Sequence, residues 1–389
     1  MAFFWHQFIV YDRSASQPAG TGEVPGSSPE WIYLEVPQYW NKLEIDGEPL
    51  PGEGYASFGL TILLPEAGLP LGVKTIEILT AHAVYIDGIQ VARVGQPGTD
   101  TQLSIPHGSP SISEFMSAGS ELDLVIQVSN FHHRKGGILG SLQLGKEQDL
   151  RKLHERGLGL AVFQISSILI IGLYHISLFL HRRKDRIAVL FGSFCLIIAL
   201  RALTTGSAYI YELFPGISWQ LVNRLEYISF YLALPVFCMY LGTIFPREFR
   251  LWILRIIQVA GGIFPLFVLL VPAIIYTHSV QPFQAFTVLA GLYISFVLVT
   301  GIFKKRNGAG ILLAGFIIMF ATVINDVLHS NEVIYTGFYV PMGLLVFIFS
   351  QAYLISLRFT KTLRLLNGSG NIAACLHADF HSYRLTRVI

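Results

Sequence analysis

Hydrophobic residues dominate the chain from residue 157 to residue 357, in seven long runs separated by short polar connections. The runs are Gly157–Leu180, Ile187–Thr205, Leu221–Phe245, Trp252–Pro272, Phe283–Phe303, Ile311–Leu328 and Phe338–Leu357. At ~1.5 Å per helical residue, each run is long enough to cross a hydrocarbon layer ~30 Å thick. Because lipid offers the backbone no hydrogen-bond partner, runs of this kind must be helical. The pattern predicts an all-α bundle of seven transmembrane helices over residues 157–358.

Lysine and arginine are distributed unevenly between the connections. The first, third and fifth connections and residues 358–366 after the last run together carry twelve of these residues, whereas the connections 206–220, 273–282 and 329–337 carry none. Short basic connections stay in the cytoplasm. We therefore expect a multi-pass protein of the plasma (inner) membrane, with its N-terminal part extracytoplasmic and its C-terminus cytoplasmic.

From residue 31 to residue 145 the helical period gives way to short alternating segments bounded by Gly, Pro, Asn and Asp. The strand-like segments are Trp31–Val36, Ala56–Leu64, Val73–Thr80, Val84–Ile86, Ile89–Val94, Leu122–Ser129 and Leu139–Leu144. Asp87-Gly88 between two of them is a strong hairpin signal. The segment predicts an all-β sandwich of the jelly-roll kind. A polar stretch at 146–156 reads as a linker helix leading into the first crossing.

The two ends of the chain carry less information. In residues 1–30, the apolar stretch Phe3–Tyr11 is short and has no basic residue before it, so this segment reads as a weak signal or a linker. Residues 359–389 form a short cytoplasmic tail in this interpretation. They contain no heptad repeat, no phosphate-binding glycine loop and no kinase-like histidine motif.

Composition agrees with the hydrophobic pattern. The chain is 52% hydrophobic and 13% charged, with a mean hydropathy of +0.54, as expected for a membrane protein with a polar domain. The basic residues are accounted for by topology, so no nucleic-acid partner is expected. None of the three cysteines lies in residues 31–145, and no Cys-x-x-Cys spacing occurs. No disulfide, metal or cofactor is therefore expected.

Candidate ligand residues in the β domain fall into two groups, each with a structural alternative. Two aromatic residues could stack on a sugar ring or could pack in the core. A polar run near residue 130 could contact a ligand or could simply be a strand end followed by a Gly-Gly turn. Its adjacent histidines face opposite sides of a strand and lack a third partner, which argues against a metal site. The candidates are Trp40, Tyr85, Asn130, His132, His133 and Arg134.

A second set of candidates lies inside the membrane runs, where charge is costly and needs a reason. Its members have complementary signs and lie at a similar depth in the outer leaflet, which predicts a polar network. The network could join helices to one another, or it could form a ligand cavity or a switch. A transporter or channel that uses the same cluster as its path is the alternative function. The residues are Arg201, Arg224, Glu226, Asn325 and Asp326.

Several phrases of the sequence resemble one family. They are Gly172-Leu173-Tyr174-His175, Leu200-Arg201-Ala202-Leu203, Val323-Ile324-Asn325-Asp326, Pro341-Met342-Gly343-Leu344 and Phe347-Ile348-Phe349-Ser350-Gln351, with Gly52-Glu53-Gly54-Tyr55 and Tyr85-Ile86-Asp87-Gly88 in the β domain. Together with the domain order, they resemble the bacterial seven-transmembrane receptors with diverse intracellular signalling modules. The resemblance covers roughly residues 31–364.

The resemblance implies a receptor whose galactose-binding-like domain recognises carbohydrate or a similar small molecule. It also implies a cytoplasmic output module, for which the residues after the seventh run leave no room. The chain is therefore expected to be a non-enzymatic, receptor-like protein of signal transduction that relays to a separate kinase, cyclase or phosphatase. The sequence does not identify the ligand or the partner, and it does not decide whether the protein forms a homodimer.

Overall fold

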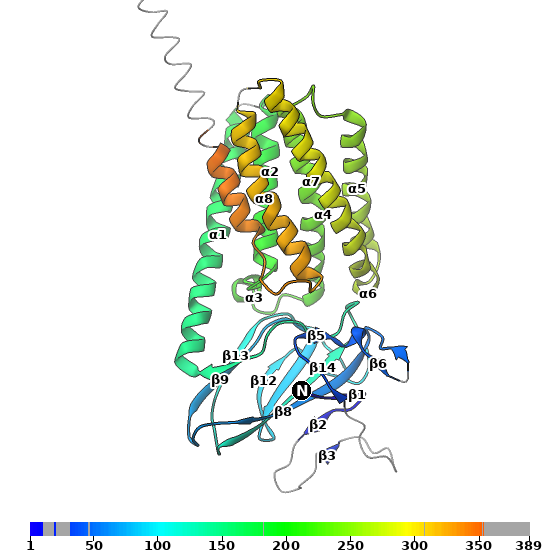
Figure 1. Ribbon diagram of the computed structural model, residues 1–389, viewed down its shortest axis with the longest axis vertical. Coiled ribbons are helices and arrows are strands. Elements are labelled where there is room, and N and C mark those ends of the chain that lie inside the picture. Colours follow the sequence, from blue (N-terminus) through cyan, green and yellow to red (C-terminus); the bar gives the residue numbers. More distant parts are fainter. Residues whose placement is uncertain are drawn as a thin grey trace, which may run out of the picture.

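The computed structural model describes residues 1–10, 19–20, 32–45, 47–181, 183–306, 308–351 and 353. An N-terminal β domain and a helical bundle stand end to end (Figure 1). The predicted tail 359–389, the seventh run beyond residue 353 and most of residues 11–31 lie outside the described residues.

The β domain is built from three main antiparallel sheets. The largest has the order β12-β11-β14-β8-β1-β4, and the other two are β10-β15-β5 and β13-β9-β16. Inward side chains from all three share one hydrophobic core, which includes Phe58, Val73 and Ile138. The strands are β1 (Ala2–Trp5), β2 (Ile9–Val10), β3 (Ala19–Gly20), β4 (Ile32–Tyr33), β5 (Gln38–Tyr39), β6 (Glu44–Ile45), β7 (Glu48–Pro49), β8 (Gly54–Leu63), β9 (Pro70–Thr75), β10 (Ile78–Leu79), β11 (Ala81–Ile86), β12 (Ile89–Val94), β13 (Ser111–Met116), β14 (Glu121–Asn130), β15 (Gly137–Ile138) and β16 (Gln143–Lys146).

The structure confirms a β-sheet region ahead of the helices, and the jelly-roll topology stays a prediction. The hairpin between β11 and β12 turns at Asp87 and Gly88, whose φ angles of +50° and +81° suit the mirror-image turn that matches strand twist. The domain begins earlier than the expected residue 31. Strand β1 pairs with β8 inside the large sheet, and its Phe3 is buried.

The helices are α1 (Glu147–His181), α2 (Arg186–Thr204), α3 (Ile210–Leu213), α4 (Trp219–Ile244), α5 (Leu251–Leu270), α6 (Ala273–Tyr276), α7 (Val280–Phe303) and α8 (Ala309–Ser330), with the 3-10 turns η1 (Trp40–Lys42) and η2 (Thr277–Ser279). Six helical segments within the described ranges are long and apolar enough to cross a membrane. They coincide with the first six predicted runs. The described part of the seventh run forms a shorter apolar helix, Val340–Gln351, so the count of seven crossings stays a prediction.

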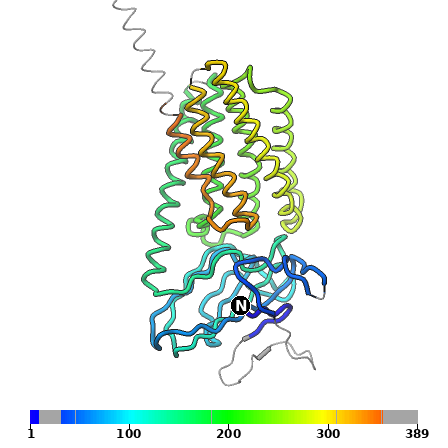
Figure 2. The backbone as a smooth tube through the Cα atoms, in the orientation of Figure 1, coloured from blue at the N-terminus to red at the C-terminus, as the bar shows by residue number. Residues whose placement is uncertain are grey.

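The chain passes once from the β domain into the bundle, at the start of α1 (Figure 2). The predicted linker helix and the first crossing form one helix of 35 residues without a break. Leu150 in its first turns is buried against the β domain, where a Cβ on Gly72 would lie 3.2 Å from its side chain. Arg151 forms an ion pair with Glu114 of β13. The helix is therefore anchored in the β domain before it enters the bundle.

Candidate functional site at the junction of the two regions

A loop between β14 and β15, residues 131–136, forms much of the contact between the β domain and the bundle; we call it the junction loop. Asn130 fixes its shape, because its side-chain amide donates to the carbonyl oxygens of His133 and Lys135 at 2.6 and 2.9 Å. The side-chain oxygen Oδ1 of Asn130 accepts from the His133 N–H at 3.1 Å. Gly136 must be glycine, since a Cβ there would lie 2.2 Å from the Trp40 ring. The sequence thus holds the loop firmly on the domain core.

The middle of the junction loop contacts the helices directly. The Arg134 N–H donates to Thr277 Oγ1 at 3.2 Å, and His133 Nε2 lies 3.4 Å from the Tyr227 hydroxyl of α4. Burial lowers the pKa of His133 to about 3, with the nearby positive charges of Arg134 and Lys135 acting in the same direction. The imidazole is therefore neutral at pH 7, and it contacts the bundle as a neutral hydrogen-bonding group.

Lys135 and Glu332 form an ion pair across the junction, which we call the rim pair. Lys135 Nζ lies 3.4 Å from Glu332 Oε1, donates to the Ser330 carbonyl at 3.0 Å and also contacts the Tyr39 hydroxyl. Burial lowers the pKa of Lys135 to about 8, while Glu332 opposes that shift. Lys42 reaches the other oxygen of Glu332 at 2.8 Å. The β domain is thus held by a carboxylate that is only 4% exposed.

A cavity of about 320 Å³ lies between the β domain and the bundle and extends into the helices. Its polar end is lined by the junction loop, by Glu77 of the β domain and by charged residues of the helices. Its other end is apolar. That end is lined by Phe194, Ile294, Phe316, Met319 and Phe320. The volume is at the lower end of the ~300–1,000 Å³ typical of small-molecule sites.

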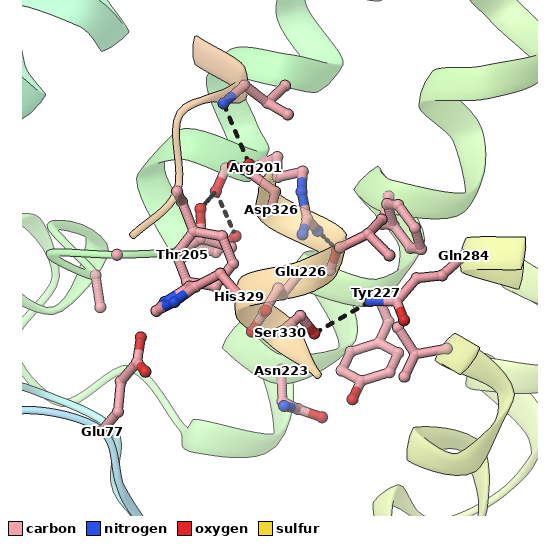
Figure 3. Close-up of a pocket in the computed structure, with 18 of the residues that line it drawn as sticks. Glu77, Arg201, Thr205, Asn223, Glu226, Tyr227, Gln284, Asp326, His329 and Ser330 are labelled. Carbon is pink, nitrogen blue, oxygen red and sulfur yellow. Dashed lines mark hydrogen bonds between the residues drawn. The ribbon is translucent and has the colours of Figure 1, made fainter. Parts of the chain in front are cut away.

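Glu77 enters the polar end of the cavity from the β domain, on the side of His329 (Figure 3). Its carboxylate makes no hydrogen bond or ion pair with any residue in the described part of the chain. Burial raises the pKa of Glu77, and His329 and Lys135 oppose that effect. The half-buried carboxylate faces the cavity without a bonding partner, which makes it a candidate ligand group.

Arg201 and Glu226 face the same space from α2 and α4 (Figure 3). Arg201 donates to the backbone carbonyl of Glu226 at 3.2 Å, and its guanidinium carbon lies 4.8 Å from the centre of the Phe230 ring. Arg201 interacts electrostatically with the carboxylates of Glu226 and Asp326. Among the residues that the structure describes, no direct ion pair joins these groups. They share a cavity instead of pairing tightly.

Asp326 has a structural role as well as a place in the cavity wall. Its two oxygens accept from the N–H groups of Tyr339 and Val340 at 2.7 and 3.2 Å. Those groups begin the helix at residue 340, so the carboxylate caps its N-terminus. The neighbouring Asn325 donates to the Gly337 carbonyl at 2.9 Å and holds the preceding connection.

The intramembrane candidates therefore divide into two groups. Arg201, Glu226 and Asp326 line the cavity, whereas Asn325 and Arg224 do not. The cavity-lining members come from three helices. Three of the residues predicted at a similar depth therefore do meet around one cavity. They do not form direct ion pairs with one another there.

The β-domain candidates divide in the same way. Trp40 is completely buried and donates its indole N–H to the Pro51 carbonyl at 3.0 Å, so the ligand interpretation is wrong for Trp40 and its packing role holds. Tyr85 lies outside the cavity wall, with its hydroxyl 3.3 Å from Gln90 Oε1. The His132 ring meets the edge of Trp219 at 6.3 Å. Of the six residues, His133 and Arg134 line the cavity.

Sequence reasoning missed three residues at the junction: Glu77, Lys135 and Glu332. Lys135 lay inside the polar run but was not singled out. Glu332 had a signal, because it is the one charged residue in a connection without lysine or arginine, residues 329–337. Glu77 had no such signal, because the sequence around it, between β9 and β10, does not distinguish an acid that faces a cavity from one that faces solvent. No group of three or more His, Cys, Asp or Glu side chains in the described ranges could hold a metal ion.

The fold and the cavity define a polytopic membrane protein with a β domain seated on its helices. The family described as 7TM diverse intracellular signalling matches residues 159–358, which is more than half of the chain, and the chain belongs to this family. It is a membrane signalling family of the receptor type. Among curated proteins, none matches the chain.

Solved structures similar to this chain include glycosidases. A GH2 β-galacturonidase from Eisenbergiella tayi has 14% identity and a TM-score of 0.25, with 37% of this chain and 23% of that chain covered. A β-glucuronidase from Ruminococcus gnavus has 12% identity and a TM-score of 0.24, with 30% and 23% covered. The present chain thus spans less than a quarter of the length of either enzyme, and likenesses of this size say nothing about its ligand.

Proposed function

We propose that this chain is a membrane receptor whose ligand binds in the cavity at the junction and changes how the β domain sits on the bundle. The observation that carries the proposal is the shared cavity wall. The junction loop and Glu77 come from the β domain, while Arg201, Glu226 and Asp326 come from the helices. A ligand that contacts both regions has different affinities for different arrangements of them, and only such a difference can shift a conformational equilibrium.

We further propose that the β domain is extracytoplasmic and that the C-terminus is cytoplasmic. The connections without lysine or arginine contain α3, α6 and Glu332, all of which lie next to the β domain (Figure 1). Basic connections lie at the far end of the bundle, where Arg306 pairs with Glu248 at 3.1 Å. This distribution supports the proposed orientation. The signal would then emerge at the far end and reach a separate kinase, cyclase or phosphatase.

The proposal can be tested before a ligand is known, by tethering a small group inside the cavity. Thr205 lines the cavity, so T205C in a Cys375→Ser background can be modified with 2-hydroxyethyl methanethiosulfonate. The native Cys195 and Cys238 are buried. Hydrogen–deuterium exchange of the full chain in nanodiscs then reports on the far-end connections 245–250 and 304–306.

We expect modification at position 205 to change exchange at the far end several-fold. The matched control is S120C, because Ser120 is exposed on the β domain and does not line the cavity. Its modification should leave the far end unchanged. Complete modification of T205C without any change at the far end would show that the cavity is not coupled to the cytoplasmic side.

A further inference from the structure

The charges around the inner part of the cavity do not balance. Two carboxylates, Glu77 and Glu226, make no side-chain hydrogen bond or ion pair with the described residues, and Asp326 is a third acid. Arg134 and Arg201 are the permanent cations of this set, and His329 acts on Glu77 electrostatically. The buried His82 and His133 and the half-buried His107 do not supply the missing charge, because burial lowers the pKa of each. The inner cavity has one permanent positive charge fewer than it has acids.

The rim pair does not supply that charge either. Lys135 already faces Glu332, as does Lys42, whose side chain is 50% exposed and therefore screened by solvent. Lys135 influences Glu77 electrostatically without bonding to it. The acids without a permanent cation therefore lie deeper in the cavity than the rim pair, next to the helices.

Glu77 and Glu226 line the inner cavity from its two sides. Glu77 belongs to the β domain and Glu226 to α4, both line the cavity, and the charge of Glu77 acts unfavourably on the Glu226 carboxylate. Arg201 interacts with Glu226 and Asp326, and Arg134 acts on the Tyr39, Tyr227 and Tyr231 hydroxyls and not on these acids. Two acids that face each other across a cavity are best stabilised by a cation between them.

Aromatic rings surround the same place. Tyr211, Trp219, Tyr227 and Phe230 line the same cavity, and Tyr211 and Tyr227 interact electrostatically with Glu226. The Arg201 guanidinium lies 4.8 Å from the centre of the Phe230 ring, so one of these rings already has a cation over its face. Organic ammonium groups are commonly recognised by a carboxylate together with aromatic faces. The adjoining floor, with Phe194, Phe316 and Phe320, is apolar.

We propose that the cavity binds a small organic amine that carries an apolar tail. The ammonium group lies between Glu77 and Glu226, and the tail occupies the apolar floor. This inference rests on the proposed function, because it names the ligand class of the same cavity. It also explains why two carboxylates remain without partners in the two halves of the junction: the amine joins them and thereby joins the β domain to the bundle.

Three compounds with one tail and different heads test the inference: 2-phenylethylamine, 2-phenylethanol and 3-phenylpropionate. Ethanolamine tests the head without the tail. Binding to the full chain in nanodiscs is measured by equilibrium dialysis. We expect the amine to bind at least tenfold more tightly than the other three. Equal binding of the propionate would overturn the ammonium assignment, because the unpartnered Nε of Arg134 would then be the recognition group. Equal binding of ethanolamine would overturn the role of the floor.

Variants locate the amine within the cavity. E77Q and E226Q keep the shape of the side chains and should each weaken binding at least tenfold, whereas E66Q, at an exposed position, should not. A233F fills the cavity from α4 and should abolish binding, and A285F, at an exposed position on α7, is its control. Amine binding that survives E77Q, E226Q and A233F would place the amine elsewhere and overturn the inference.

The same samples separate this inference from the proposed function. Amine binding that depends on Glu77 and Glu226 without any change in far-end exchange would support the ligand class and contradict the receptor function. Conversely, a far-end response to the neutral group tethered at position 205, with no binding of the amine, would support the receptor and overturn the amine.

Discussion

The two halves of the helical bundle are built on different principles. The half next to the β domain places Arg201, Glu226 and Asp326 around a cavity of about 320 Å³. The far half is closely packed with aromatic rings. The centre of the Phe191 ring there lies 5.0 Å from that of the Tyr240 ring, and the Tyr240 hydroxyl donates to Gln351 at 2.8 Å. The half next to the β domain thus contains a cavity and carboxylates without bonding partners. The described core residues of the far half are packed rings and hydrogen-bonded polar groups.

This difference indicates how a signal could pass between the halves. A packed core resists local rearrangement, since its side chains already occupy nearly all of the available volume. The open half can change the positions of its polar groups at lower cost. A change that begins in the cavity should therefore reach the far end as a movement of whole helices, with the packed half moving as a unit.

The largest effect that tests this comparison comes from the same truncation made in each half. Phe347→Ala removes a fully buried ring and should lower the free energy of unfolding by about 3–5 kcal/mol. Phe230→Ala removes a ring that borders the cavity and should cost about 1–3 kcal/mol, because part of its surface faces existing space. Unfolding of the purified protein in mixed micelles measures both.

The comparison would fail if the two truncations cost the same. Equal losses near the upper value would mean that the cavity wall is as closely packed as the far half. Leu292→Ala on the outer face of α7, where the side chain is 56% exposed, provides the baseline for a truncation that leaves the core intact.

The packed half was the easier one to predict from the sequence. The first six hydrophobic runs each coincide with a helix, although the first helix begins ten residues earlier, at Glu147, because length and apolarity alone decide whether a segment can cross lipid. Strand β1 at the start of the β domain was not predicted, because it is a short apolar strand whose pairing with β8 is a long-range contact.

The open half was predicted only in part. Depth along a helix can be counted, so Arg201, Glu226 and Asp326 were recognised as one layer. The direction in which a side chain points around its helix depends on packing that the sequence does not state, which is why Arg224 was included and lies outside the cavity. Glu77 and the rim pair could not be found by either route, since each depends on how the β domain docks.

The next prediction concerns the rim pair. A double-mutant cycle of Lys135→Met and Glu332→Gln should give a coupling energy of about 2 kcal/mol, because both side chains are mostly buried and the remaining partner would be left uncompensated. The apparent free energy of unfolding of the four proteins measures this coupling.

Lys42 provides the matched control for this cycle because it contacts the same carboxylate with a side chain that is 50% exposed. The cycle of Lys42→Met with Glu332→Gln should give less than about 1 kcal/mol, as exposed pairs do. A coupling for Lys42 that equals the coupling for Lys135 would show that burial at the junction does not strengthen the rim pair.

The smallest effect is a pH dependence at the junction loop. Burial lowers the pKa of His133 to about 3, with Arg134, Lys135 and His278 adding positive charge nearby. When the loop detaches, the ordinary pKa of ~6.5 returns, so the detached state binds a proton that the seated state does not. The seated state therefore loses stability as the pH falls below about 6.5, by about 1 kcal/mol at pH 5.5. Burial also lowers the pKa of His82 to about 3, so His82 contributes to the pH dependence with the same sign.

The contribution of His133 alone is the difference between the wild-type protein and His133→Asn. Melting temperatures of both, measured at pH 7.5 and pH 5.5, should show the smaller decrease in the variant, and an equal decrease would mean that His133 is not the group that titrates when the loop leaves the bundle.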